Sequence, residues 1–395
     1  MLMILLPVLL LSDFMPGQDF DSRLKSIVKP YQFSLAVWEA QAIPGEVRQF
    51  IAPKRESVLH SVKYEIATVT GYFALTERIK TLKLNNQPNS ISSGVELTRL
   101  QEQKAALSDT VAGILEKQIS ETLTELGIFN PVVRLRVTFP PVNFKLETPP
   151  NLLVISPRDS IESVRKITLQ PALSHKDIAE IEFRTDELGV SSLVVGLGGL
   201  GATYPTFVTD EASLQWVIEA GVHEWLHQYL TFKPLGFAYL LDLTGLRRNY
   251  DVAVMNETLA GMLGEEIGKI VYEKYYAQPA GGISQSLPAA PEFDFDREMR
   301  EIRRTVDSYL ARGEISQAEE FMKESRESLA AKGYNIRKLN QAYFAFYGTY
   351  SDSPTSINPI GSELRELRAK SASPKDFLDR ASVLTSHQQL RDSIK

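Results

Sequence analysis

The sequence contains no cysteine and no excess of positive charge, and both absences exclude classes of chemistry. Without cysteine the chain forms no disulfide, no thiolate metal site and no cysteine nucleophile, so any bound metal is held through nitrogen and oxygen atoms. The formal net charge of −6 offers no basic footprint for nucleic acid. We therefore expect no nucleic-acid partner.

Long apolar runs are also absent, apart from the first eleven residues, MLMILLPVLLL. A membrane-spanning helix needs about 20 apolar residues, whereas this run has the length of the apolar part of an export signal or of a truncated anchor. A basic start and a small-residue cleavage site are missing, so a buried N-terminal segment is the alternative. We expect residues 1–15 to be a signal or membrane-anchor segment, which makes the protein extracytoplasmic, secreted or membrane-anchored; otherwise it is cytoplasmic.

The chain of 395 residues is long enough for two or three domains. Two helix-compatible segments, at residues 54–84 and 94–127, flank the polar turn sequence NNQPNSISS and predict a long helical hairpin. We assign this hairpin to a first domain at residues 16–128. Its expected role is structural or partner-binding, because it contains no group of residues with an evident chemistry.

The pattern changes between residues 129 and 277 to short strands and further helices. Proline, glycine and aspartate separate the strand-like runs PVVRLRVTF, VNFKLE, NLLVISP, SSLVVGL and TYPTFV, and a helix is expected around HKDIAEIEFRTDELG. A polar linker at residues 278–294 then leads into a helical C-terminal subdomain at residues 295–395. The chain is therefore predicted to have an α+β fold with helical additions at both ends.

One helix of the middle domain carries the sequence HEWLH. A proline-free run can extend from an N-terminus at Asp210 and Glu211 to Phe232. His223 and His227 are four residues apart, so both imidazoles project from one helix face and can converge on a single ion. This spacing favours a metal site.

Glu224 lies about 100° around the helix from His223, beside such an ion rather than on it. From that position its carboxylate can hold and deprotonate a water molecule. The helix is apolar nearly all round, so we expect it to be buried and its polar side chains to need partners. Gly221 suggests that another backbone passes close by. The alternative is an ordinary pair of hydrogen-bonded core histidines without a metal.

A second helix, DVAVMNETLAGMLGEEIGKIVYEKYY, supplies a candidate third ligand, Glu257, and has Asp251 as its candidate N-cap. Small neighbours on the face of Glu257 let one helix approach another closely, as a short carboxylate requires to reach an ion on the neighbouring helix. A carboxylate on such a buried face is costly without a cation. The small residues that share this face are Ala253, Ala260, Gly261, Gly264 and Gly268.

The run VHEWLHQYL is followed by the run MNETLAGML, with Glu257 30 positions after His227, and the pair resembles the motifs of gluzincin zinc metallopeptidases, the group of thermolysin and the membrane alanyl aminopeptidases. The resemblance covers residues 193–270. It implies a Zn²⁺ cofactor held by His223, His227 and Glu257, with Glu224 as the water-activating residue. It also implies a zincin-like core, which combines a small mixed sheet with an active-site helix.

Three departures from the family pattern bear on the activity. Asn256 and Ala260 complete the family's N-E-x-x-A sequence, but Gly261 stands where thermolysin-like enzymes have an aspartate that orients a ligand histidine. The alanyl aminopeptidases bind the substrate's amino terminus through the Glu of a G-x-M-E-N segment, and the comparable run GLGGLGATYP has no acid. The gap between the second and third ligands is also longer. We therefore favour an endopeptidase or a specialised processing enzyme over an aminopeptidase.

The resemblance also implies a tyrosine or histidine from the C-terminal helical half that stabilises the oxyanion. After His227 the only histidine is His387, near the end of the chain, so a tyrosine is favoured. In LNQAYFAFYGTY, Tyr343 and Tyr347 share a helix face, with Tyr350 just beyond it. We assign the role to Tyr347, and core packing of this aromatic stripe is the alternative.

The glycine-rich run SSLVVGLGGLGATYPTF precedes the HEWLH helix, where zincins have the edge strand that pairs with an extended substrate. A turn between two core strands is the alternative. The predicted function is zinc-dependent hydrolysis of a peptide or protein substrate, with a candidate membrane tether at the N-terminus. The competing hypothesis is a non-catalytic helical scaffold or interaction protein with a structural or vestigial metal site.

Overall fold

The computed structural model describes most of the chain, and some sequence-based predictions lie outside the described residues. These are the apolar segment at residues 1–15, the strand expected from residue 131 to 137 and most of the linker at residues 278–294. Within the part that is described, no helix is long and apolar enough to cross a membrane. The described residues are 18–33, 61–85, 91–130, 138–200, 203–244, 246–277, 293–350 and 353–395.

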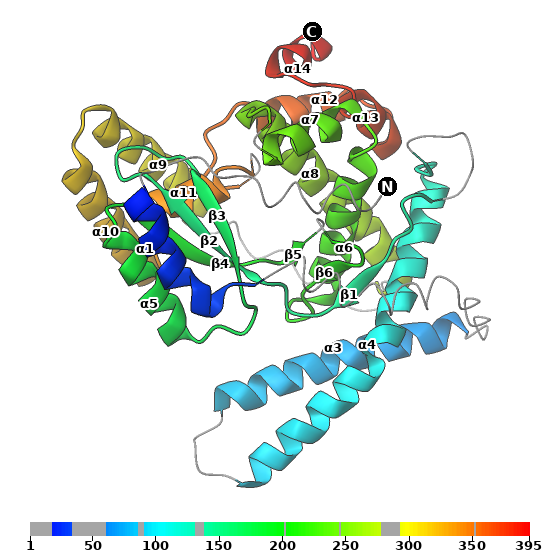
Figure 1. The fold of residues 1–395 in the computed structure, drawn as a ribbon. Coiled ribbons are helices and arrows are strands. Elements are labelled where there is room, and N and C mark those ends of the chain that lie inside the picture. Colours follow the sequence, from blue (N-terminus) through cyan, green and yellow to red (C-terminus); the bar gives the residue numbers. More distant parts are fainter. Residues whose placement is uncertain are drawn as a thin grey trace.

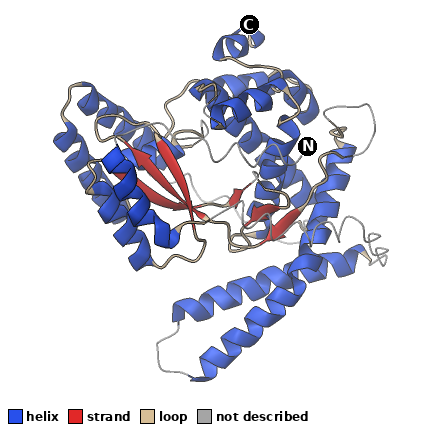
Figure 2. Ribbon diagram, viewed as in Figure 1, coloured by secondary structure: helices blue, strands red, loops and turns tan. Residues whose placement is uncertain are grey.

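Helices make up most of the fold, and two small sheets lie among them (Figure 1 and Figure 2). The expected mixture of helices and strands is confirmed. The helices are α1 (Gln18–Val28), the 3-10 helix η2 (Lys29–Tyr31), α3 (Val62–Asn85), α4 (Ile91–Glu125), α5 (His175–Asp186), α6 (Leu214–Leu230), α7 (Pro234–Leu243), α8 (Tyr250–Tyr275), α9 (Phe295–Ala311), α10 (Ile315–Ala331), α11 (Gln341–Tyr347), α12 (Ile360–Ala369), α13 (Pro374–Ala381) and α14 (His387–Ser393).

The first sheet is antiparallel, with β2 in its centre between β3 and β4. Successive side chains of a strand point to opposite faces, so Leu153 packs with α1 and α5 while Val154 packs with α11 on the other face. Both faces of the central strand are therefore covered, which explains why its sequence is apolar almost throughout. The strands are β2 (Asn151–Ser156), β3 (Arg165–Leu169) and β4 (Ser191–Gly196).

The second sheet has the order β1-β6-β5, in which β1 and β6 are parallel and β5 is antiparallel to β6. The strand β6 ends shortly before α6, so this sheet leads directly into the HEWLH helix. Phe144 of β1 lies against Gly221 of α6. The strands are β1 (Phe144–Leu146), β5 (Gly199–Leu200) and β6 (Thr206–Val208).

The predicted helical hairpin is present as α3 and α4, which lie side by side in Figure 1. A buried charged group fastens it to the rest of the molecule. Lys104 Nζ lies 2.8 Å from Asp210 Oδ2, and the Tyr72 hydroxyl donates a hydrogen bond to the same carboxylate. Because Asp210 is only 4% exposed, this ion pair is shielded from solvent and holds the hairpin near the start of α6.

The largest core joins the hairpin to β1, α6 and α8, and continues into α12 and α13. By contrast, α9 and α10 form a separate apolar cluster with Phe344 of α11. The C-terminal helices thus pack in two places, one group beside α8 and the other near the β3-β2-β4 sheet. The predicted domain boundaries stay a prediction.

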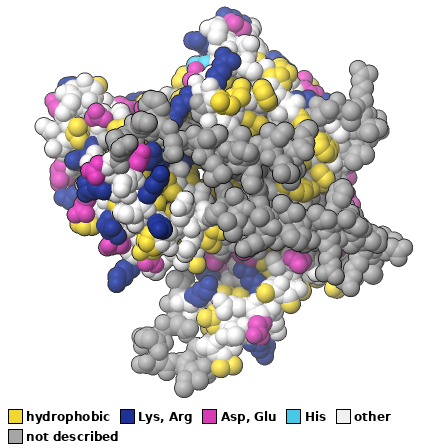
Figure 3. All heavy atoms as spheres, viewed as in Figure 1, with side chains coloured by type: hydrophobic (Ala, Val, Ile, Leu, Met, Phe, Trp, Pro, Cys, Tyr) yellow, Lys and Arg dark blue, Asp and Glu magenta, His cyan; other side chains and the backbone are white. Residues whose placement is uncertain are grey.

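On the face drawn in Figure 3, Lys and Arg side chains are interspersed with Asp and Glu side chains over the described residues. A mixture of both signs is the ordinary pattern of a solvated surface.

Candidate metal centre

The helix α6 presents the two histidines of HEWLH. It begins at Leu214, because the Ser213 side chain accepts a hydrogen bond from the backbone N–H of Trp216. The predicted start at Asp210 and Glu211 is therefore wrong, and the predicted end at Phe232 is two residues late. The reason is tertiary: Asp210 is engaged by the hairpin, so the next residue with a suitable hydroxyl caps the helix.

The helix α8 presents the third predicted ligand, Glu257. Its N-cap is Asn249, whose side chain accepts from the N–H of Val252, and not Asp251 as predicted. Glu257 lies on the buried side of α8, where it is 9% exposed. It comes from the middle of a 26-residue helix, so its position is set by a long and well-packed element.

Glycines bring α6 and α8 together, as the small-residue face predicts. A Cβ at position 264 would lie 3.0 Å from the Cβ of His223, and one at position 268 would lie 2.7 Å from the Cα of Glu219. The close backbone approach is thus at Gly264 and Gly268. The expectation that another backbone passes Gly221 is wrong, because side chains of β1 and α4 lie there instead.

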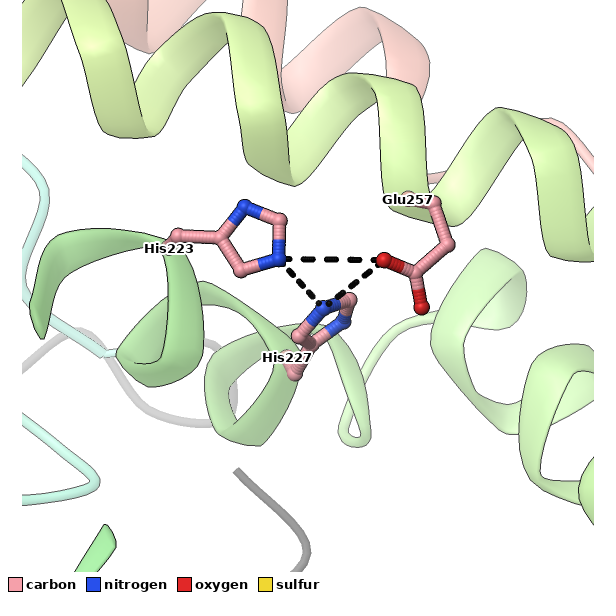
Figure 4. Close-up of side chains that lie close together, drawn as sticks. All are labelled: His223, His227 and Glu257. Carbon is pink, nitrogen blue, oxygen red and sulfur yellow. Dashed lines mark hydrogen bonds and ion pairs between the residues drawn. The ribbon is translucent and has the colours of Figure 1, made fainter. Parts of the chain in front are cut away.

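His223, His227 and Glu257 point toward one another, two from α6 and one from α8 (Figure 4). The Nε2 atoms of the two histidines are 3.0 Å apart, and Glu257 Oε2 lies 3.7 Å from that of His223 and 3.5 Å from that of His227. These separations define a point about 2.0 Å from all three atoms, and zinc bonds to nitrogen and oxygen ligands are about 2.0–2.2 Å long. The three residues therefore fit a zinc ion.

His227 has a hydrogen-bond partner that orients its ring. Its Nδ1 lies 2.8 Å from Asn256 Oδ1, and an amide oxygen can only accept, so Nδ1 carries the proton and donates it. Nε2 is then free to act as a ligand. Asn256 thus gives His227 an orienting hydrogen bond of a kind that Gly261, which has no side chain, cannot supply.

Sequence reasoning missed Tyr239, on α7 between the two ligand-bearing helices. The Tyr239 hydroxyl donates a 2.6 Å hydrogen bond to Glu257 Oε1, which leaves Oε2 facing the histidines. Burial and the neighbouring carboxylate of Glu257 raise the pKa of Tyr239 well above its ordinary value, so the hydroxyl keeps its proton. The only signal in the sequence was a proline-started apolar helix, PLGFAYLLDL, lying between the two motifs.

The charges at the centre stabilise one another. Burial opposes the charged form of His227, but Glu257 outweighs burial and raises the pKa of His227 to about 9. Burial likewise opposes ionisation of Glu257, but the two histidines hold its pKa well below the usual range. Without a metal, the His227 imidazole therefore carries a second proton at neutral pH and is positively charged. The negative charge of Glu257 thus favours a positive charge beside it, whether on the imidazole or on a bound metal ion.

Glu224 lies beside the three ligands and against the strand β5. A Cβ at position 199 would clash with the Glu224 side chain, at 2.8 Å from Cγ and 2.9 Å from Cδ, and one at position 198 would clash with the Trp216 ring. The two glycines therefore let β5 pass directly over the carboxylate. In the sheet order β1-β6-β5, this strand is at an edge.

Tyr347 is not brought to the three ligands. Its ring lies 4.6 Å from that of Tyr343 and 5.0 Å from that of Phe346, on the side of α11 that packs on the β3-β2-β4 sheet. Tyr350, three residues later, lines a pocket together with Glu257. The predicted aromatic stripe on α11 is therefore present, and its first two tyrosines pack in a core cluster.

No known protein family, no curated protein and no solved structure matches the chain.

Proposed function

We propose that this protein is a zinc-dependent peptidase of the gluzincin type, with His223, His227 and Glu257 as metal ligands and Glu224 as the catalytic base. One observation carries the proposal: the ligand atoms of two separate motifs lie around a point about 2.0 Å from each, which is the length of a zinc bond. Nitrogen and carboxylate oxygen are also the donor set that zinc takes in catalytic sites.

A zinc ion bound there supplies Lewis-acid polarisation of the scissile carbonyl and of a water molecule. Glu224 takes the proton of the attacking water and returns it to the leaving amine, since it lies one residue from His223 and faces the space under β5. Asn256 and Tyr239 keep the ligand side chains oriented. A tyrosine from the C-terminal half remains our proposal for the oxyanion partner; Tyr350 is better placed for this role than Tyr347.

The arrangement of β5 supports a peptide as the substrate. Its pairing among the described residues is with β6 on one side only, and Gly198 and Gly199 bring its backbone against the HEWLH helix. An extended peptide adds to such an edge through main-chain hydrogen bonds. A sheet, an active-site helix and a third-ligand helix that follow in this order also support the proposed zincin-like core.

The competing proposal, a scaffold with a structural metal, requires no role for Glu224. The test is therefore Glu224→Gln, with Glu211→Gln as the matched control because Glu211 is exposed and lies near the same helix. We expect wild type and E211Q to cleave an unfolded protein substrate after loading with zinc, and E224Q to bind one zinc per chain without cleaving. Equal cleavage by E224Q, or no zinc in the wild type, contradicts the proposal.

A further inference from the structure

A small pocket adjoins the metal centre on the side of Glu257. Its walls come from β3, α7, α8, α11 and the turn after α11. Its volume is about 60 Å³, enough for a few water molecules or one small end group rather than a large side chain. The pocket therefore lies where α7 and α8, the helix that carries Glu257, meet β3 and α11.

Lys166 of β3 is the cation of this pocket. Its neighbour Arg165 points to the other face of the strand and forms an ion pair with Asp21 of α1. Lys166 itself has no hydrogen bond or ion pair to any described residue, and its side chain is exposed. The nearby carboxylate of Asp242 has a different partner, because its Oδ1 accepts a 2.6 Å hydrogen bond from the backbone N–H of Asn249.

The surroundings of Lys166 differ from those of an ordinary surface lysine. Desolvation by the protein around the cleft lowers the pKa of Lys166, and the carboxylates of Glu257 and Asp242 oppose that shift. Lys166 as a residue is nonetheless exposed, so a ligand can reach its side chain. A lysine that lies inside a cleft, beside two carboxylates with other partners, offers a charge to an incoming anion.

We propose that Lys166 binds a carboxylate of the peptide substrate, so that the pocket selects substrates by a negative charge next to the bond that is cleaved. This inference rests on the proposed peptidase function. A carboxylate has the size of the pocket, and a peptide can supply one from two sources: its free C-terminus or an Asp or Glu side chain. The first source makes the enzyme act near the C-termini of peptides.

The test measures binding to the inactive E224Q protein loaded with zinc, by calorimetry. Three probes separate the sources: N-acetyl-pentaalanine with a free C-terminal acid, the same peptide as the amide, and the amide with glutamate at its third position. A hydrogen-bonded ion pair contributes about 1.5–3 kcal/mol, so we expect at least about tenfold tighter binding of one acidic probe than of the neutral amide. The acidic probe that binds more tightly identifies the source.

Lys166→Met in the same background is expected to abolish this preference, and Lys166→Arg to retain most of it. Lys176→Met is the matched control, because Lys176 is an exposed lysine on α5, and it should retain the preference in full. Equal binding of all three probes, or a preference that persists in K166M, overturns the inference. A protein that loses its cleavage in E224Q but shows no preference for acidic probes refutes this inference alone, whereas the absence of any Glu224-dependent cleavage refutes the proposed function.

Discussion

Zinc binding should release a proton from His227, and its affinity should therefore rise with pH. The carboxylate of Glu257 raises the pKa of His227 to about 9 in the metal-free protein, whereas a metal ligand must be a neutral imidazole. Two pH units below that pKa, binding must first remove the proton. At pH 7 the affinity is then about 100-fold lower than its limit at high pH, a difference of about 2.7 kcal/mol.

The assay is a competitive zinc titration against a chromophoric chelator at intervals from pH 6.5 to 8.5. We expect the logarithm of the affinity to rise by about one for each pH unit. Calorimetry in buffers of different ionisation enthalpy should find about one proton released for each zinc bound. In Glu257→Gln the pKa of His227, followed by NMR, should fall toward its ordinary value. An affinity that does not change over this range refutes the assignment of the proton and of the ligand.

Three further predictions concern stability and geometry. The metal-free protein should lose up to about 3 kcal/mol of stability as pH rises from 6.5 through 9, because the raised pKa of His227 stabilises the fold only while the imidazole is charged; urea unfolding that shows no decline in this range contradicts this. Tyr239→Phe should weaken zinc binding about tenfold without unfolding the protein, since the hydroxyl orients Glu257; an unchanged chelator titration refutes it. Gly199→Ala should displace Glu224 and reduce kcat about 100-fold at unchanged zinc content; an unchanged kcat counts against Glu224 as the base.

The spacing of residues along single helices was enough to predict which side chains share a helix face. Residues four apart on a helix must share a face, so His223 and His227 could be paired without knowledge of the fold. The small residues near Glu257 indicated close helix packing, and the contacts at Gly264 and Gly268 are of that kind. The prediction of close packing on the Glu257 face therefore agrees with the structure, whereas the similar prediction for Gly221 does not.

The predictions that failed depended on partners distant in the sequence. Asp210 is a good N-cap by type, but Tyr72 and Lys104 take its carboxylate, and Ser213 caps the helix. The strand β3 was missed because an edge strand with charged residues lacks a clear apolar pattern. The hydrogen bond of Tyr239 to the Glu257 carboxylate depends on how α7 packs against α8, which no local sequence pattern predicts.

The most direct test of the central claim is an anomalous-diffraction measurement at the zinc absorption edge on crystals of the zinc-loaded protein. We expect one strong peak about 2.0–2.2 Å from Nε2 of His223, Nε2 of His227 and Oε2 of Glu257. A peak at another place, or no peak between these three atoms, contradicts it.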